Sequence, residues 1–193
     1  ANTDLRIATW NLHGGIGRDG RYDAARVIAV LAEIDADIIA LQEVPSLALH
    51  AELMRSIQTR LGHHVAMGRT LTRLDADFGN ALLSRFPIVG QLNVDLTVAS
   101  HEPRNAIDAD IDVAGHAIRV LATHLGLRPA ERRIQVQRIL STVDAFPDAP
   151  TLLLGDINEW YLWGRPLRWL RARFRAAPSP ATFPSRLPLF ALD

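Results

Sequence analysis

The sequence has no cysteine and no lysine, and each absence restricts what the protein can do. Without cysteine there are no disulfide bonds and no thiolate metal sites, and cysteine usage gives no indication of a redox compartment. All 21 basic residues are arginine, a side chain that binds phosphate through two parallel hydrogen bonds. A general bias toward arginine is the simpler explanation of this composition. Apolar runs stay well short of the roughly 20 residues that a membrane-spanning helix needs.

The length and the charge set further bounds. The chain of 193 residues, 48% of them hydrophobic, predicts a single domain over residues 1–193 with one sizeable core. The formal net charge is zero, which argues against binding of nucleic acid through bulk electrostatics. The chain begins with neither a methionine nor an apolar leader, so we expect a processed or excised chain. The compartment stays unassigned, with the cytoplasm favoured.

Residues 151–158, with the sequence TLLLGDIN, organise the interpretation of the whole chain. Four residues that suit a buried strand lead into Gly155, and Asp156 and Asn158 follow. Strand ends that feed loops are where α/β proteins place their chemistry. If the chain stays extended, Asp156 and Asn158 point to one side and bring an acceptor and a donor together. The alternative is an Asp/Asn turn that only ends the strand.

Two earlier strands are also expected to end at polar residues. Residues 5–11 alternate as a strand that ends at Asn11, and residues 38–42 form a buried strand that delivers Glu43. A helical pattern separates them, with Val27, Val30, Leu31 and Ile34 on one face. A right-handed crossover then makes the strands neighbours and puts Asn11 and Glu43 side by side. A hard divalent cation prefers oxygen ligands of this kind.

The loop after the first strand contains Gly15, Gly17 and Gly20 in the spacing G-x-G-x-x-G of a dinucleotide-binding turn. In that fingerprint the first glycine follows the strand almost at once and the third lies inside the helix. Here the helical pattern begins only after Gly20. A flexible loop beside a site is therefore the better interpretation.

The middle of the chain changes from a helical period to a strand period. A helix is expected over residues 46–61, and residues 79–84 and 88–94 then predict two strands joined by the short turn 85–87.

A further pair of strands is expected over residues 104–111 and 117–123, joined through Gly115. These strands should be antiparallel, so the sheet is mixed. The second of them ends at His124, so a fourth strand end carries a polar group.

Six short motifs follow one another along the chain: Trp10-Asn11, Leu41-Gln42-Glu43, Gly79-Asn80-Ala81-Leu82-Leu83-Ser84-Arg85, Arg104-Asn105-Ala106, Thr123-His124-Leu125 and Gly155-Asp156-Ile157-Asn158. Each motif is weak alone, but together they span nearly the whole chain. On these residues the sequence resembles the endonuclease/exonuclease/phosphatase superfamily. That superfamily comprises metal-dependent phosphoesterases, including DNase I-like nucleases, neutral sphingomyelinases and inositol polyphosphate phosphatases. Residues 126–135 are similar to small bacterial members.

The resemblance implies an α/β fold, a four-layer αββα sandwich of two mixed sheets flanked by helices. It also implies a hydrolase that uses Mg²⁺, with Mn²⁺ as the alternative metal. The implied roles are metal binding for Glu43 and Asn11, substrate binding for Asn11, Asn80 and Arg104, and catalysis for His124, Asp156, Asn158 and Asp193. Asp156 would orient or deprotonate the attacking water, and His124 would contact the scissile phosphate or protonate the leaving oxygen.

The sequence departs from the family pattern at two places. His13 stands where nuclease members often carry a second acid or amide, which weakens the case for a nuclease and for a second metal. The terminal Ser-Asp-His motif of the family is absent, since no Ser-Asp dipeptide occurs. Residues 190–193 resemble the start of the penultimate strand, in which the aspartate, here Asp193, orients the missing histidine. We therefore expect a C-terminally truncated chain without its final strands.

Two questions stay open at this stage. The substrate is a nucleic acid, a phospholipid headgroup or a small phosphoester, and no obligate protein partner is inferred. The alternative from another class is a non-catalytic module that binds phosphate ligands with the same fold.

Residues 161–193 contain six arginines and one acid, and they predict a basic amphipathic helix. Its apolar stripe and the tryptophans near it are Leu167, Leu170, Phe174, Trp160, Trp163 and Trp169. A surface helix with a solvated face is the simpler interpretation, and peripheral contact with an anionic membrane is the alternative.

Overall fold

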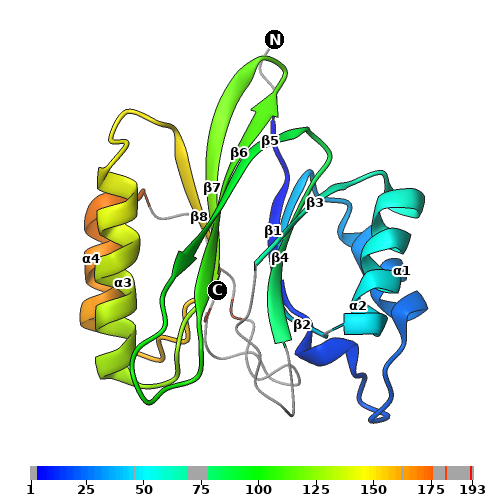
Figure 1. Ribbon diagram of the computed structural model, residues 1–193, viewed down its shortest axis with the longest axis horizontal. Coiled ribbons are helices and arrows are strands. Elements are labelled where there is room, and N and C mark those ends of the chain that lie inside the picture. The colour runs from blue at the N-terminus through cyan, green and yellow to red at the C-terminus, as the bar shows by residue number, and fades with distance from the viewer. Residues whose placement is uncertain are drawn as a thin grey trace.

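The computed structural model describes residues 4–45, 47–68, 78–161 and 163–175, together with residues 181 and 192. Two four-stranded sheets pack face to face, and helices cover both outer faces (Figure 1). Each sheet contains parallel and antiparallel pairs. The predicted four-layer sandwich of two mixed sheets is therefore confirmed.

The first sheet has the order β1-β2-β4-β3, with β1 (Ile7–Asn11), β2 (Ile38–Pro45), β3 (His64–Met67) and β4 (Phe78–Ser84). The second has the order β5-β6-β7-β8, with β5 (Ile88–Asp95), β6 (Asn105–Val113), β7 (His116–His124) and β8 (Thr151–Asp156). The helices are the 3₁₀ turn η1 (His13–Gly15), α1 (Ala24–Ile34), α2 (Leu47–Ser56), the π-type η2 (Ile57–Leu61), α3 (Pro129–Asp144) and α4 (Arg165–Arg173).

The two parallel pairs fix where the polar strand ends meet. β1 pairs with β2 and places Asn11 opposite Gln42, while β7 pairs with β8 and places His124 opposite Asp156. Because parallel strands end at the same edge, the predicted polar residues of each sheet gather at one edge. The expected adjacency of the first two strands is confirmed.

The two strands expected on either side of the turn 85–87 form as β4 and β5, but they enter different sheets. β4 already pairs with β2 on one edge and β3 on the other, so β5 has no free edge to join. The four-residue strand β3 was not predicted, because it follows directly on the helical segment that ends with η2.

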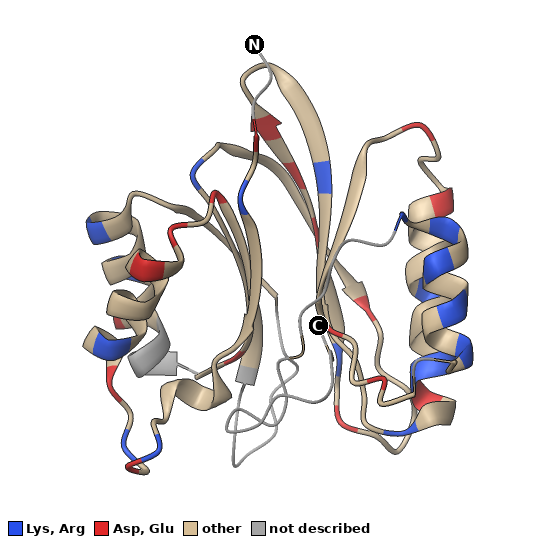
Figure 2. Cartoon of the chain, turned by 180° about the vertical axis from the view of Figure 1, so that it is seen from behind, with Lys and Arg blue, Asp and Glu red and all other residues tan. Residues whose placement is uncertain are grey.

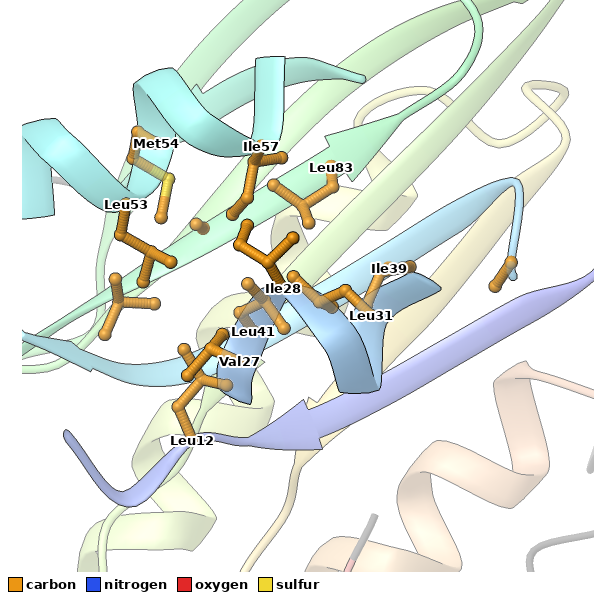
Figure 3. Packing of buried hydrophobic residues seen from close by; sticks show 13 residues of the cluster. Leu12, Val27, Ile28, Leu31, Ile39, Leu41, Leu53, Met54, Ile57 and Leu83 are labelled. Carbon is orange, nitrogen blue, oxygen red and sulfur yellow. The ribbon is translucent and has the colours of Figure 1, made fainter. Parts of the chain in front are cut away.

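Three hydrophobic clusters hold the layers together. The first lies between the first sheet and α1, α2 and η2 (Figure 3). In α1 the buried residues are Val27, Ile28 and Leu31, so the core-facing side includes Ile28 in place of the expected Val30. In the third cluster, α3 and α4 pack on the second sheet through residues that include Val136, Ile139 and Leu170.

The second cluster lies between the two sheets, and several of its residues are small. Ala40 and Ala66 come from the first sheet, and Ala109 and Ala122 come from the second; all four are buried. Small side chains let the sheets approach closely, because packed cores leave few voids.

The glycine loop does not have the geometry of a dinucleotide-binding turn. Helix α1 begins only at Ala24, after the N-cap residue Asp23, which accepts a hydrogen bond from the Arg26 amide. The Arg26 guanidinium lies beside Gly17 and pairs with Asp19 at 2.8 Å. The glycines therefore lie in a loop that ends before the helix, as expected. Among the helices that the structure describes, none is long and apolar enough to span a bilayer.

Candidate active site

A chain of polar contacts joins the two sheets at the edge where their parallel strands end. The Asn11 Nδ2 donates to Glu43 Oε1 at 3.1 Å and lies 3.4 Å from Asp156 Oδ2. Asn11 and Glu43 belong to the first sheet and Asp156 to the second. One amide therefore holds two carboxylates together across the sandwich, and the predicted side-by-side placement of Asn11 and Glu43 is confirmed.

Glu43 is turned toward this edge by a local break in β2. The register of β2 against β4 shifts between Leu41 and Val44, and Glu43 has a left-handed φ of 50°. Such a bulge changes the direction of a side chain, and a left-handed non-glycine residue costs on the order of 1 kcal/mol or more. The strained backbone is therefore that of Glu43, the residue whose side chain contacts Asn11. His13 lies on the other side, with Nδ1 at 3.4 Å from Glu43 Oε2.

The chain does not stay extended after Asp156. Asn158 has a φ of 53°, and its amide N–H donates to Asp156 Oδ1 at 2.9 Å, as in an Asx turn. The Asn158 side chain donates to Leu125 O at 2.9 Å. The expectation that Asp156 and Asn158 point to one side of an extended chain is thus wrong. Asn158 instead fixes the orientation of the Asp156 carboxylate and ties it to the loop after β7.

Gly155 allows β8 to approach β7 at this point. Its φ is 132°, and a Cβ there would lie 1.9 Å from the Thr123 carbonyl oxygen. Any other residue would push Asp156 away from His124, because the clash is with backbone.

His124 is held between Asp156 and Arg104. Its Nδ1 is 2.9 Å from Arg104 Nη1, and its Nε2 is 3.7 Å from Asp156 Oδ2. A guanidinium only donates, so Nδ1 accepts and Nε2 carries the proton. Burial, and secondarily the Arg104 charge, lowers the pKa of His124 to about 3 from its usual 6.5. The contact between His124 and Asp156 is therefore made by a neutral imidazole and is no ion pair.

Replacing His124 by glutamine is expected to flatten the pH dependence of stability. The folded pKa lies below the unfolded value, so between about pH 3 and 6.5 the unfolded chain binds one more proton. The free energy of unfolding should then rise with pH by about 1.4 kcal/mol per unit in this window. Urea unfolding in EDTA at pH 4.5, 5.5 and 6.5 measures the slope. His116→Gln, at an exposed position, is the control, and equal slopes in the wild type and His124→Gln would contradict the argument.

Asn80 and Arg104 occupy different parts of the site. Asn80 Nδ2 donates to Asn105 Oδ1 at 2.9 Å and to the Asn105 carbonyl oxygen, to which the Thr123 hydroxyl also donates. Asn105 begins β6 next to Arg104 and was not assigned a role from the sequence, although its motif was noted. Asn80 is therefore connected to the site through Asn105, while Arg104 contacts His124 directly.

A buried ion pair that sequence reasoning missed lies behind the Asp156 loop. Arg132 of α3 and Glu159 are both almost fully buried, with Nη2 and Oε1 3.3 Å apart. Arg132 Nη1 also donates to the carbonyl oxygen of Leu127 at 2.6 Å. The pair thus joins α3 to the loops that follow β7 and β8. An arginine in a helix usually lies on the solvated face, so only the fold could identify this contact.

The candidate metal ligands at this edge carry oxygen donors, the ligand type that hard cations prefer. Within the described part of the chain, no three His, Asp or Glu side chains gather into a closed metal cage. Two carboxylates, of Glu43 and Asp156, converge on the amide of Asn11. Magnesium takes one or two carboxylates and completes its shell with water, so the Glu43 carboxylate suits it as a ligand.

Asp193, the last predicted site residue, lies outside the described residues. Its neighbour Leu192 is described and buried, and the Leu192 carbonyl oxygen accepts a hydrogen bond from the Ile157 amide at 2.8 Å. Leu192 therefore lies beside Ile157, the residue that follows Asp156.

Comparisons with known proteins identify the family to which this fold belongs. A sequence model of the Endonuclease/Exonuclease/phosphatase family matches residues 8–191. The chain belongs to the endonuclease/exonuclease/phosphatase family. This family consists of hydrolases with the DNase I-like fold, and the resemblance seen in the sequence is confirmed. The YbhP protein of Escherichia coli (strain K12) is 31% identical, with 98% of this chain and 83% of that protein covered.

Solved structures of the endonuclease/exonuclease/phosphatase family show the same fold. The family member from Beutenbergia cavernae is 27% identical with a TM-score of 0.72, covering 86% of this chain and 53% of that one. The human Nocturnin catalytic domain is 20% identical with a TM-score of 0.72, covering 87% and 68% respectively. The chain thus spans about half the length of the Beutenbergia protein.

Proposed function

We propose that this member of the family hydrolyses phosphodiesters with water as the nucleophile. The observation that supports this most is the contact of the Asn11 amide with both Glu43 and Asp156, with His124 next to Asp156. Carboxylates that can accept a proton from water therefore lie close to N–H groups that can donate hydrogen bonds to phosphoryl oxygens. YbhP and the Beutenbergia protein support the family but name no substrate.

Each residue of the site has a role in this proposal. Asp156 accepts the proton of the attacking water, whose oxygen bonds to phosphorus while the bond to the leaving oxygen breaks. The leaving oxygen takes its proton from solvent. Neutral His124 donates a hydrogen bond from Nε2 to a phosphoryl oxygen, because a pKa of about 3 leaves no imidazolium at neutral pH to act as an acid. Arg104 fixes the tautomer of His124.

The remaining residues position the reacting groups. Glu43 and Asn11 would hold Mg²⁺, with Mn²⁺ as the alternative. The ion, when bound, supplies positive charge that stabilises the transition state. Asn158 orients Asp156 through its backbone amide, and Asn80 orders Asn105 at the far side of the site. The substrate class is a nucleic acid, a phospholipid headgroup or a small phosphoester. The Nocturnin structure contains a bound sulfate anion, which has the shape of phosphate.

The test is hydrolysis of bis-p-nitrophenyl phosphate, a small soluble diester, with Mg²⁺, with Mn²⁺ and with EDTA. Turnover that EDTA abolishes supports the proposal. Binding of phosphate without turnover of this diester would instead identify the non-catalytic module that the sequence left as an alternative.

Replacing Glu43 by glutamine is expected to weaken Mg²⁺ binding roughly tenfold or more, since a charged oxygen ligand becomes neutral. Isothermal titration calorimetry measures the affinity directly, without an activity assay. His124→Ala should leave this affinity nearly unchanged and lower turnover. Glu33→Gln, an exposed carboxylate of α1, is the matched control. Equal affinity in the wild type and Glu43→Gln would remove Glu43 from the metal site.

A further inference from the structure

Exposed apolar side chains gather in the loops that follow β1, β7 and β8, at the edge that holds the site. Nine large hydrophobic residues are exposed in the described part of the chain, and five of them lie in these loops: Ile16, Leu127, Trp160, Tyr161 and Trp163. Trp163 is 72% and Leu127 65% exposed. Tyr161 and Trp163 are in contact, and Trp160 precedes them directly in the chain, so these three form an exposed apolar cluster of the kind that marks interaction surfaces.

Two of these loops are held together by the buried ion pair behind the site. Arg132 donates to the carbonyl oxygen of Leu127 and pairs with Glu159, and Glu159 Oε1 accepts from the Tyr161 amide at 3.2 Å. Leu127 and Tyr161 are thus anchored to the same guanidinium and carboxylate. The rings of Tyr161 and Trp163 lie 5.6 Å apart. The buried ion pair therefore holds the loops that carry Leu127 and Tyr161 in place.

Among the described residues of the same loops, the exposed charges that have no ion-pair partner are basic. Asp19 pairs with Arg26, and Glu159 is buried against Arg132. Exposed arginines that have no carboxylate within 4.0 Å among the described residues are Arg18, Arg21, Arg128 and Arg165. Figure 2 shows that arginines also continue along the helices α3 and α4. The five apolar residues and these four arginines are called the rim below.

We propose that the rim docks the protein on an anionic phospholipid membrane. Trp and Tyr side chains favour the boundary between headgroups and acyl chains, and arginines beside them contact lipid phosphates. Docking would bring the site to a phospholipid headgroup. This consequence rests on the phosphodiester hydrolysis proposed above.

A single-stranded nucleic acid fits the rim less well. Binding by base stacking needs aromatic faces on which successive bases lie. The planes of Tyr161 and Trp163 are inclined by 44° to each other, and Ile16 and Leu127 have no ring. The zero net charge also gives little bulk attraction to a polyanion. Aliphatic and aromatic side chains together are instead suited to insertion between lipids.

The experiment is sedimentation of the full chain with vesicles of phosphatidylcholine, alone or with 30% phosphatidylglycerol. Binding to the anionic vesicles is expected, with weaker binding to the neutral ones. The double variant Tyr161→Ser/Trp163→Ser should lower the partition coefficient about tenfold. Arg128→Gln/Arg165→Gln should lower it too and reduce its dependence on salt. Melting curves verify that each variant is folded.

The matched controls lie away from the rim. Val89→Ser removes an exposed apolar side chain from β5, and Arg55→Gln removes an exposed charge from α2. Neither should change vesicle binding. Absence of binding, equal binding to both vesicles or an equal loss in the controls would overturn the proposal. So would rim-dependent binding of an oligonucleotide without binding of vesicles. Hydrolysis of soluble bis-p-nitrophenyl phosphate by the wild type is read separately, so failure of docking and failure of catalysis are distinguishable.

Discussion

Replacing Asp156 by asparagine is expected to lower hydrolysis of a soluble phosphodiester by about 10³-fold, within the range that a positioned general base contributes. The amide keeps the shape of the carboxylate and still accepts the hydrogen bond from the Asn158 backbone, so the Asx turn should survive. It has no charge with which to take a proton from water. Initial rates with saturating Mg²⁺ measure the effect on turnover.

The control for this prediction is Asp148→Asn, which removes an exposed carboxylate from the loop after α3. Its rate should equal that of the wild type. Melting temperatures of both variants separate a loss of catalysis from a loss of folding. Less than a tenfold fall in the rate of a folded Asp156→Asn protein would show that another group accepts the proton.

Replacing Arg132 by methionine is expected to destabilise the protein by about 3–5 kcal/mol, because it leaves Glu159 buried without its partner charge. Methionine fills much of the same volume, so the effect is electrostatic and not that of a cavity. The double variant Arg132→Met/Glu159→Met should recover most of the loss, since no unpaired charge stays in the interior. Urea unfolding measures the three free energies.

Arg173→Met supplies the comparison, because Arg173 of α4 also pairs with a residue of α3, Asp144, at 2.9 Å, but at the surface. Its loss should cost about 1 kcal/mol or less. If the Arg132 and Arg173 variants lost equal stability, burial would not be the reason for the effect. The Arg132 variant should also lower turnover, because the loop that carries Asp156 and Asn158 loses its attachment to α3.

Much of the site was predictable because strand ends obey simple rules. A buried run followed by a polar residue identified Asn11, Glu43, His124 and Asp156, and parallel pairing then brings such residues to one edge. No property of the sequence says that β4 and β5 enter different sheets, because a hairpin and a crossing between sheets use similar turn residues. The residue at which a strand ends was thus easier to predict than the strand with which it pairs.

Contacts between distant polar residues were beyond sequence reasoning. Arg132 and Glu159 are separated by 26 residues and lie in elements of different type. The left-handed backbone of Asn158 belongs to a local turn with Asp156, which the sequence offered as the alternative, whereas its side-chain hydrogen bond to Leu125 exists only once β7 and β8 are paired. Side-chain parity along an extended strand could not foresee that turn. The family motif pointed to these residues, while their local geometry depended on the fold.

The alanines between the two sheets control the distance between Asn11 and Asp156 in the candidate site. Asn11 and Asp156 stand on opposite sheets, so their 3.4 Å separation depends on how closely the sheets approach. That approach is set by the volumes of buried side chains such as Ala40 and Ala122, which lie in the core between the sheets. A methyl group added there would widen the gap that the substrate must bridge. Catalytic rate and substrate size in this protein can therefore change through interior substitutions that leave every polar residue in place.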